Sequence, residues 1–139
     1  MTIVPLPDSQ RFLAVVDRTI QLVGEKVPLE TLREMAEVFH VLCWEFPDWG
    51  VQRYFILSDS GEVESTSEWV GPVDSTITMD ARTLHDIAFG YTSPIMAFFM
   101  GRLRVTGMPS AKLGKFLPLL EPFLASYRQA CAEPRGESA

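Results

Sequence analysis

The chain has 139 residues, near the roughly 150 residues typical of one domain, and 47% of them are hydrophobic and 22% charged. This composition is typical of a protein with a packed core and excludes an intrinsically disordered chain. Twelve Lys and Arg residues against 18 Asp and Glu give a net charge of −6. That is the wrong sign for a protein that follows a phosphate backbone, so we expect no nucleic-acid partner.

The cysteine content and the hydropathy pattern predict a cytoplasmic protein. Cys43 and Cys131 are far apart in the sequence, which excludes a disulfide-rich scaffold and a Cys-x-x-Cys site and fits a reducing compartment. The N-terminus lacks the basic start and apolar run of a secretory signal. No apolar stretch approaches the 18 or so residues that span a membrane.

Two helices are predicted before the first strand. Asp8 and Ser9 are favoured N-cap residues, and apolar residues at close to helical spacing predict a helix over about 9–23. Pro28 suits the first position of a second helix. The stretch 38–46 fits either a continued helix or a strand, because its apolar residues match both periods.

The middle of the chain predicts strands joined by short turns. Residues 51–57 are rich in β-branched and aromatic residues, and 63–69 and 75–79 alternate between apolar or small and polar side chains. Turn sequences containing Gly or Pro separate these segments. If 38–46 is the first strand, we expect an antiparallel meander over about 38–79.

Helices dominate the last third of the sequence. Asp80 is a favoured N-cap, and a second short helix follows over 95–100, where all six residues are apolar. A helix that is apolar on every side must be enclosed or must face another apolar surface. Residues 102–106 alternate as a fifth strand, and Pro118 and Pro122 predict that the final helical region is kinked or in two pieces.

Recognisable catalytic and metal-binding motifs are absent from the sequence. His85 and Asp86 are sequence neighbours that point in different directions on a helix, so we expect a surface or hydrogen-bonded histidine rather than a general base. His40 and Cys43 would share a helical face only if that segment were helical, and no third or fourth ligand is evident. We therefore expect neither a metal nor a cofactor.

The charges are unevenly distributed. Residues 87–120 contain no Asp or Glu and carry +4, so by subtraction the rest of the chain carries −10. One explanation is that a mostly buried segment has few charges; the other is that its basic residues meet anionic head groups beside an apolar surface. The basic residues are Arg102, Arg104, Lys112 and Lys115.

The run Ala97–Gly107 contains an Ala-Phe pair, a glycine, a strand of alternating basic and apolar residues, and a second glycine. This pattern resembles the hallmark of the sterol carrier protein type 2 family. Upstream, the strand at 75–79, the helix after it, Gly90 and Pro94 are similar to the family's segments before that hallmark. The resemblance covers about residues 29–126.

The resemblance implies an α/β sandwich in which helices cover a five-stranded, mainly antiparallel sheet and enclose an apolar tunnel. It implies that 38–46 is the first strand and that the domain binds sterols, fatty acids, fatty acyl-CoA or phospholipids without catalysis. The expected division is an N-terminal helical extension (1–28), a lipid-binding domain (29–126) and a C-terminal tail (127–139).

Apolar residues of the last third are the candidates for the tunnel wall, although plain core packing is at least as good an explanation for each. They are Leu84, Ile87, Ile95, Phe98, Phe99, Leu103, Leu113, Phe116, Leu117 and Leu120. The candidates for a head-group contact are Arg102, Arg104, Lys112 and Lys115.

Three functions are compatible with this reading. The first is lipid binding or transfer with transient membrane contact. The second is an interaction module, such as a homodimer, in which side chains fill the tunnel and the N-terminal helix or exposed Trp44, Trp49 and Trp69 form the contact surface. The third, an enzyme with His85 as base, has the least support.

Overall fold

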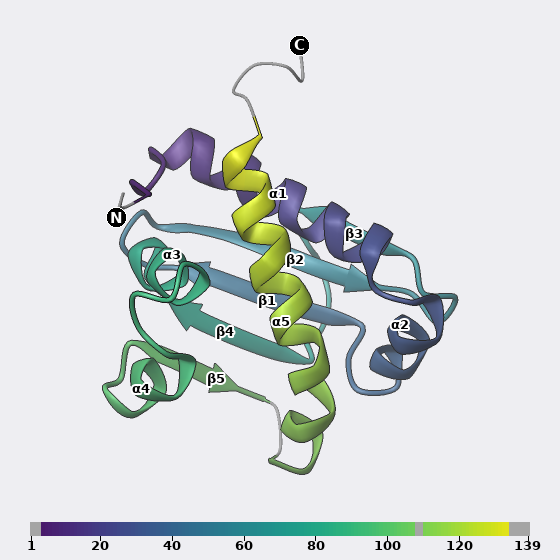
Figure 1. Ribbon diagram of the computed structural model, residues 1–139. Coiled ribbons are helices and arrows are strands. Elements are labelled where there is room, and N and C mark those ends of the chain that lie inside the picture. The colour runs from purple at the N-terminus through teal and green to yellow at the C-terminus, as the bar shows by residue number, and fades with distance from the viewer. Residues whose placement is uncertain (1–3, 108–109, 134–139) are drawn as a thin grey trace.

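The computed structural model describes residues 4–107 and 110–133, with side chains described for all of these except 110–118. Five strands and five helices follow one another in this range (Figure 1). In chain order they are α1 (Ser9–Lys26), α2 (Leu29–Ala36), β1 (Val41–Phe46), β2 (Val51–Leu57), β3 (Val63–Thr66), β4 (Ser75–Met79), α3 (Ala81–Ala88), α4 (Pro94–Phe99), β5 (Leu103–Thr106) and α5 (Ser110–Ala132). The predicted fold class, including the extra N-terminal helix and the strand reading of the ambiguous stretch, is confirmed.

The sheet is mixed, with the strand order β3-β2-β1-β4-β5. Three strand pairs are antiparallel, but β4 lies parallel to β1. The predicted meander is therefore correct only through β3. The Asp74 carboxylate accepts hydrogen bonds from the backbone N–H groups of His40, at 2.7 Å, and Val41, at 2.9 Å, and so holds the start of β4 beside the start of β1.

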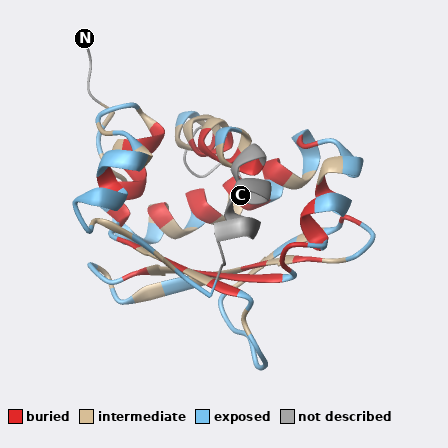
Figure 2. Cartoon of the chain, turned by 90° about the horizontal axis from the view of Figure 1, so that it is seen from below, coloured by how far each residue is buried: buried red, intermediate tan, exposed pale blue. Residues whose placement is uncertain are grey.

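The helices lie on one side of the sheet (Figure 2). Because side chains alternate along a strand, β1 directs Leu42, Trp44 and Phe46 to the helical side, where all three are buried. Figure 2 shows buried residues both on the strands of the sheet and on the helices that cover it. Trp44 was expected to be exposed; it is 4% exposed because of this placement, so that prediction is wrong.

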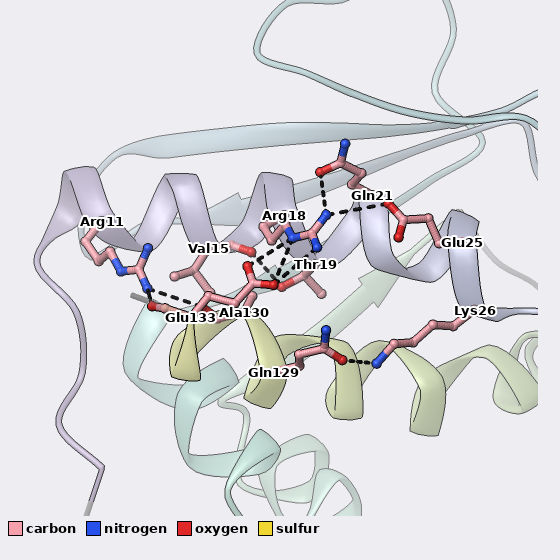
Figure 3. A network of polar contacts seen from close by, with 10 residues as sticks. All are labelled: Arg11, Val15, Arg18, Thr19, Gln21, Glu25, Lys26, Gln129, Ala130 and Glu133. Carbon is pink, nitrogen blue, oxygen red and sulfur yellow. Dashed lines mark hydrogen bonds and ion pairs between the residues drawn. The ribbon is translucent and has the colours of Figure 1, made fainter. Parts of the chain in front are cut away.

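Helix α1 packs against both the sheet and α5. The Phe12 ring lies edge-on to Phe46, at 4.9 Å between ring centroids, and to Trp49, at 5.3 Å. At the outer seam, Arg18 Nε donates to Glu133 Oε1 at 3.0 Å, and Lys26 donates to Gln129 (Figure 3). Arg11 caps the end of α5 by donating to the backbone oxygen of Glu133 at 2.8 Å.

The last helix, α5, occupies the region in which the sequence predicts a final helical segment. Around Pro118 and Pro122 the sequence predicts either a kinked helix or a helix in two pieces. The structure has one continuous helix, α5, which runs to Ala132, so the two-piece form is wrong. Tyr127 and Ala130 are buried in it, so the boundary expected at residue 127 falls inside a packed helix. The limits of the lipid-binding domain itself remain a prediction.

Helix caps and two glycines fix the backbone of the segment from α3 to β5. The backbone N–H of Ala81 is capped by the Asp48 carboxylate at 3.0 Å and not by the Asp80 side chain. Ser93 is the N-cap of α4, and its hydroxyl accepts a hydrogen bond from the backbone N–H of Met96; after the helix, Gly101 turns the chain at a φ of 75°. At Gly107 (φ 82°) a Cβ would lie 2.8 Å from the Asp74 oxygen, so both glycines of the motif have a backbone function.

Candidate functional site

An apolar pocket of about 430 Å³ lies between the sheet and helices α3, α4 and α5. Its volume falls in the range of roughly 300–1,000 Å³ that is usual for small-molecule sites. Every residue of its described wall is apolar or aromatic. They are Trp44, Ile77, Met79, Leu84, Ile87, Pro94, Ile95, Phe98, Phe99, Leu103, Val105, Leu120, Phe123 and Leu124.

The floor of the pocket is made by β4 and β5. Ile77 pairs with Val105 and Met79 with Leu103, so these four side chains project from the same face of two adjacent strands. The intervening polar residues of both strands point to the opposite face. The alternation that predicted half-buried strands therefore also produces a continuous apolar floor.

The roof and inner wall are centred on a ring stack. Trp44 of β1 and Phe123 of α5 lie 4.7 Å apart between ring centroids, with an interplanar angle of 6°. The Trp44 indole N–H is buried and has no hydrogen-bond partner among the described residues, which is uncommon for a buried tryptophan. The contacts that the described residues make with the Trp44 ring are therefore packing contacts.

Helix α4 forms the mouth of the pocket. Only Ala97 of this helix is buried, whereas Ile95, Phe98 and Phe99 line the pocket and are also exposed to solvent. Of the two arrangements expected for this all-apolar helix, enclosure is not found; the helix faces the apolar pocket with part of its surface and solvent with the rest. A six-residue helix at the edge of the sheet has too few neighbours to cover it.

Seven of the ten predicted wall residues lie on this pocket: Leu84, Ile87, Ile95, Phe98, Phe99, Leu103 and Leu120. Leu113, Phe116 and Leu117 belong to the part of α5 whose side chains are not described. The prediction missed Trp44, Ile77, Met79, Pro94, Val105, Phe123 and Leu124. The alternation of β4 and β5 could have identified Ile77, Met79 and Val105; the contact of Trp44 with Phe123 has no sequence signal.

The predicted head-group residues are not on the described pocket wall. Arg102 pairs with Asp86 at 3.3 Å, and Arg104 is exposed on the other face of β5, opposite Thr78. Lys112 and Lys115 fall among the undescribed side chains. A shallower depression adjoins the pocket across Ile87 and Leu120, and the unpredicted Arg128 lies on its wall.

His85 is completely buried and makes two hydrogen bonds. Its Nε2 lies 2.8 Å from the backbone oxygen of Val4, which can only accept, so Nε2 carries the proton. Nδ1 then accepts from the Tyr127 hydroxyl at 2.8 Å. Burial lowers the pKa of His85. Because the side chain is 0% exposed, a substrate cannot reach the ring in this arrangement. The expectation of a hydrogen-bonded histidine is confirmed.

The described residues offer few alternatives to an apolar ligand site. No group of three or more His, Cys, Asp or Glu side chains in residues 4–107 and 119–133 could hold a metal ion. Within the part of the chain that the structure describes, no helix is long and apolar enough to cross a bilayer.

Solved structures resemble this fold at low sequence identity. The sterol carrier protein domain 2 of Helicoverpa armigera matches with a TM-score of 0.58 and 18% identity, over 97% of this chain and 99% of that one. A crystal structure of sterol carrier protein 2 matches with a TM-score of 0.58 and 17% identity, over 84% and 95% of the two chains. These likenesses establish the fold.

The fold also occurs inside a larger enzyme. The inverting sec-alkylsulfatase Pisa1 from Pseudomonas sp. matches with a TM-score of 0.57 and 20% identity over 74% of this chain, which spans only 16% of the sulfatase. A sequence comparison with curated proteins gives no match. The family model of the SCP-2 sterol transfer family matches residues 20–119, well over half of the chain. The chain therefore belongs to the SCP-2 sterol transfer family.

Proposed function

We propose that the protein binds one lipid molecule, such as a fatty acid, fatty acyl-CoA, sterol-like molecule or phospholipid, without catalysing a reaction on it. The observation that carries this proposal is the apolar pocket of about 430 Å³ with its mouth at α4. Family membership supports lipid binding in general. His85 is buried and both of its ring nitrogens make hydrogen bonds, which supports a function without general-base chemistry.

Burial of an alkyl chain suffices for useful affinity. About 15 methylenes at ~0.8 kcal/mol each contribute roughly 12 kcal/mol before the costs of association and ordering, which are of order 4 to 15 kcal/mol. Micromolar affinity is therefore within reach without any polar anchor. Because the described wall is apolar, we propose that the tail enters first and the polar end stays at the mouth.

The alternative of an interaction module requires side chains to fill this interior. The pocket volume argues for lipid binding instead, and homodimerisation remains a prediction.

The free thiols of Cys43 and Cys131 support the reducing, cytoplasmic setting expected from the sequence.

Displacement of a fluorescent fatty acid tests the proposal. We expect micromolar displacement by the wild type and at least a tenfold loss in Val105→Trp, which adds an indole to the floor. Val70→Trp is the matched control, because Val70 is 98% exposed and away from the pocket. Mass spectrometry of the purified protein should detect co-purified lipid. A lipid-free protein that displaces no probe would contradict the proposal.

A further inference from the structure

We propose that Arg128 binds the anionic head group, a carboxylate or a phosphate, of a lipid whose tail lies in the apolar pocket. This inference rests on the lipid binding proposed above. The site is the depression that adjoins the pocket, called here the head-group depression. It lies between one side of α5 and the segment that runs from the end of α3 to the start of α4.

The head-group depression is continuous with the pocket. Four residues belong to the walls of both: Ile87, Pro94, Leu120 and Leu124. A molecule whose tail fills the pocket can therefore place its other end in the depression and remain in contact with the protein along its whole length.

One side of α5 leads from the apolar wall to a positive charge. Leu120, Leu124 and Arg128 are spaced four residues apart, so they follow one another along the same side of the helix. The two leucines line the pocket, and Arg128 lies one turn beyond Leu124, about 6 Å along the helix axis. An alkyl chain packed against the leucines thus ends close to a cation.

The two walls differ in chemistry as the two ends of an amphipathic ligand do. The described pocket wall is wholly apolar, whereas the wall of the depression includes Thr92, Ser93, Glu121 and Arg128. Among the described residues of both walls, Arg128 is the only cation. The planar guanidinium of arginine matches carboxylate and phosphate groups, which it binds through two parallel hydrogen bonds. An anionic head group is therefore the ligand chemistry that this depression selects.

The contacts of Arg128 position its guanidinium and leave it open to exchange. Nη1 donates to the backbone oxygen of Ala88, at the end of α3, at 2.7 Å. Nη2 donates to Glu121 Oε1 at 3.2 Å. These contacts use two of the five N–H donors of a guanidinium. The Glu121 side chain is 76% exposed, so the ion pair contributes little to stability and a ligand carboxylate or phosphate can replace Glu121.

Because Glu121 competes with the ligand for Arg128, substitutions at the two positions should act in opposite directions. The assay is displacement of a pyrene-labelled fatty alcohol by palmitate, hexadecyl phosphate or hexadecanol, which are saturated and have the same number of carbons. We expect Arg128→Gln to weaken the binding of an anionic ligand by about tenfold and Glu121→Gln to strengthen it severalfold. Uncharged hexadecanol should bind both variants like the wild type. The anion with the larger loss in Arg128→Gln identifies the head group as carboxylate or phosphate.

Arg102→Gln is the matched control. The Arg102 side chain is 34% exposed, against 39% for Arg128, and it also forms an ion pair, with Asp86, but it is on neither wall. This variant should bind all three ligands like the wild type. Thermal unfolding verifies that each variant is folded, and Glu121→Gln, at an exposed position, keeps the test complete if loss of the Ala88 contact unfolds Arg128→Gln.

Several results would overturn the head-group site. An equal loss for anions and hexadecanol in Arg128→Gln would show that Arg128 only supports the end of α3. Unchanged binding of both anions to Arg128→Gln, weaker or unchanged binding to Glu121→Gln, or an equal loss in Arg102→Gln would also contradict the proposal.

The uncharged ligand separates this site from lipid binding itself. Displacement by hexadecanol together with anion binding that is insensitive to Arg128 would overturn the head-group site and leave lipid binding intact. Failure of the probe and of all three ligands to bind the wild type would instead overturn the proposed lipid binding, and the head-group site with it.

Discussion

Trp44 shows how one side chain takes its role from its surroundings. In the sequence it is one of three tryptophans suited to a surface contact, yet strand β1 directs it into the core. There it stacks on Phe123 and forms part of the pocket wall. No described residue accepts a hydrogen bond from its indole N–H. Trp44 should therefore report directly on the pocket.

Fluorescence quenching tests this role and the tail-first orientation. A fatty acid brominated near its methyl end should quench Trp44 more strongly than one brominated near its carboxyl group. Trp44→Phe should abolish the ligand-dependent quenching, while Trp69→Phe, in an exposed loop, should retain it. Stronger quenching from the carboxyl side would contradict the orientation.

At the scale of elements, α1 is integrated with the rest of the fold. Besides the Phe12 ring contacts, Asp17 of α1 accepts from Arg53 of β2 at 2.8 Å and from Ser65 of β3 at 2.7 Å. The helix thus contacts two strands as well as α5. Although α1 lies entirely before residues 29–126, it contributes to the same hydrophobic core.

The substitution Phe12→Ala tests how much the packing of α1 contributes to the free energy of unfolding. Phe12 is 0% exposed, so Phe12→Ala should lower the free energy of unfolding by about 3–5 kcal/mol in chemical denaturation. Gln21→Ala, at an exposed position of the same helix, should change it by less than about 1 kcal/mol. A small effect of Phe12→Ala would show that α1 is an appendage.

At the scale of the molecule, His85 connects three separate parts of the chain. It lies on α3, donates to Val4 in the N-terminal segment and accepts from Tyr127 on α5. These bonds fit a neutral ring. Desolvation by burial lowers the pKa of His85 from its usual value of 6.5; the hydrogen bond to Val4 and the charge of Asp86 oppose this with smaller effects, and the charge of Arg82 lowers the pKa further. The unfolded chain therefore binds a proton at a higher pH than the folded protein does.

Stability should consequently fall as the pH decreases below 6.5. Between that value and the lower folded-state pKa, unfolding takes up one proton at His85, and its contribution approaches about 1.4 kcal/mol per pH unit. His85→Gln should flatten the pH dependence of denaturant-induced unfolding over this window. His40→Gln, at the only other histidine, should keep the wild-type contribution of His85. An unchanged slope in His85→Gln would contradict this linkage.

Local patterns in the sequence determined the elements. The spacing from Phe12 predicts α1, alternation predicts β4 and β5, and the glycines at 101 and 107 mark the turns that flank β5. These features depend on residues that are close together in the chain, so their periodicity and backbone preferences can be recognised from the sequence. For the same reason seven pocket residues, all in the segment from α3 to α5, could be predicted.

Tertiary structure decided what distant segments do together. The parallel placement of β4 depends on Asp74 reaching the start of β1, and the stack of Trp44 on Phe123 joins residues of a strand and a helix far apart in the chain. Whether α4 would be covered or exposed also depended on which elements lie beside it. Burial and cavity shape follow from such long-range contacts, and no local periodicity encodes them.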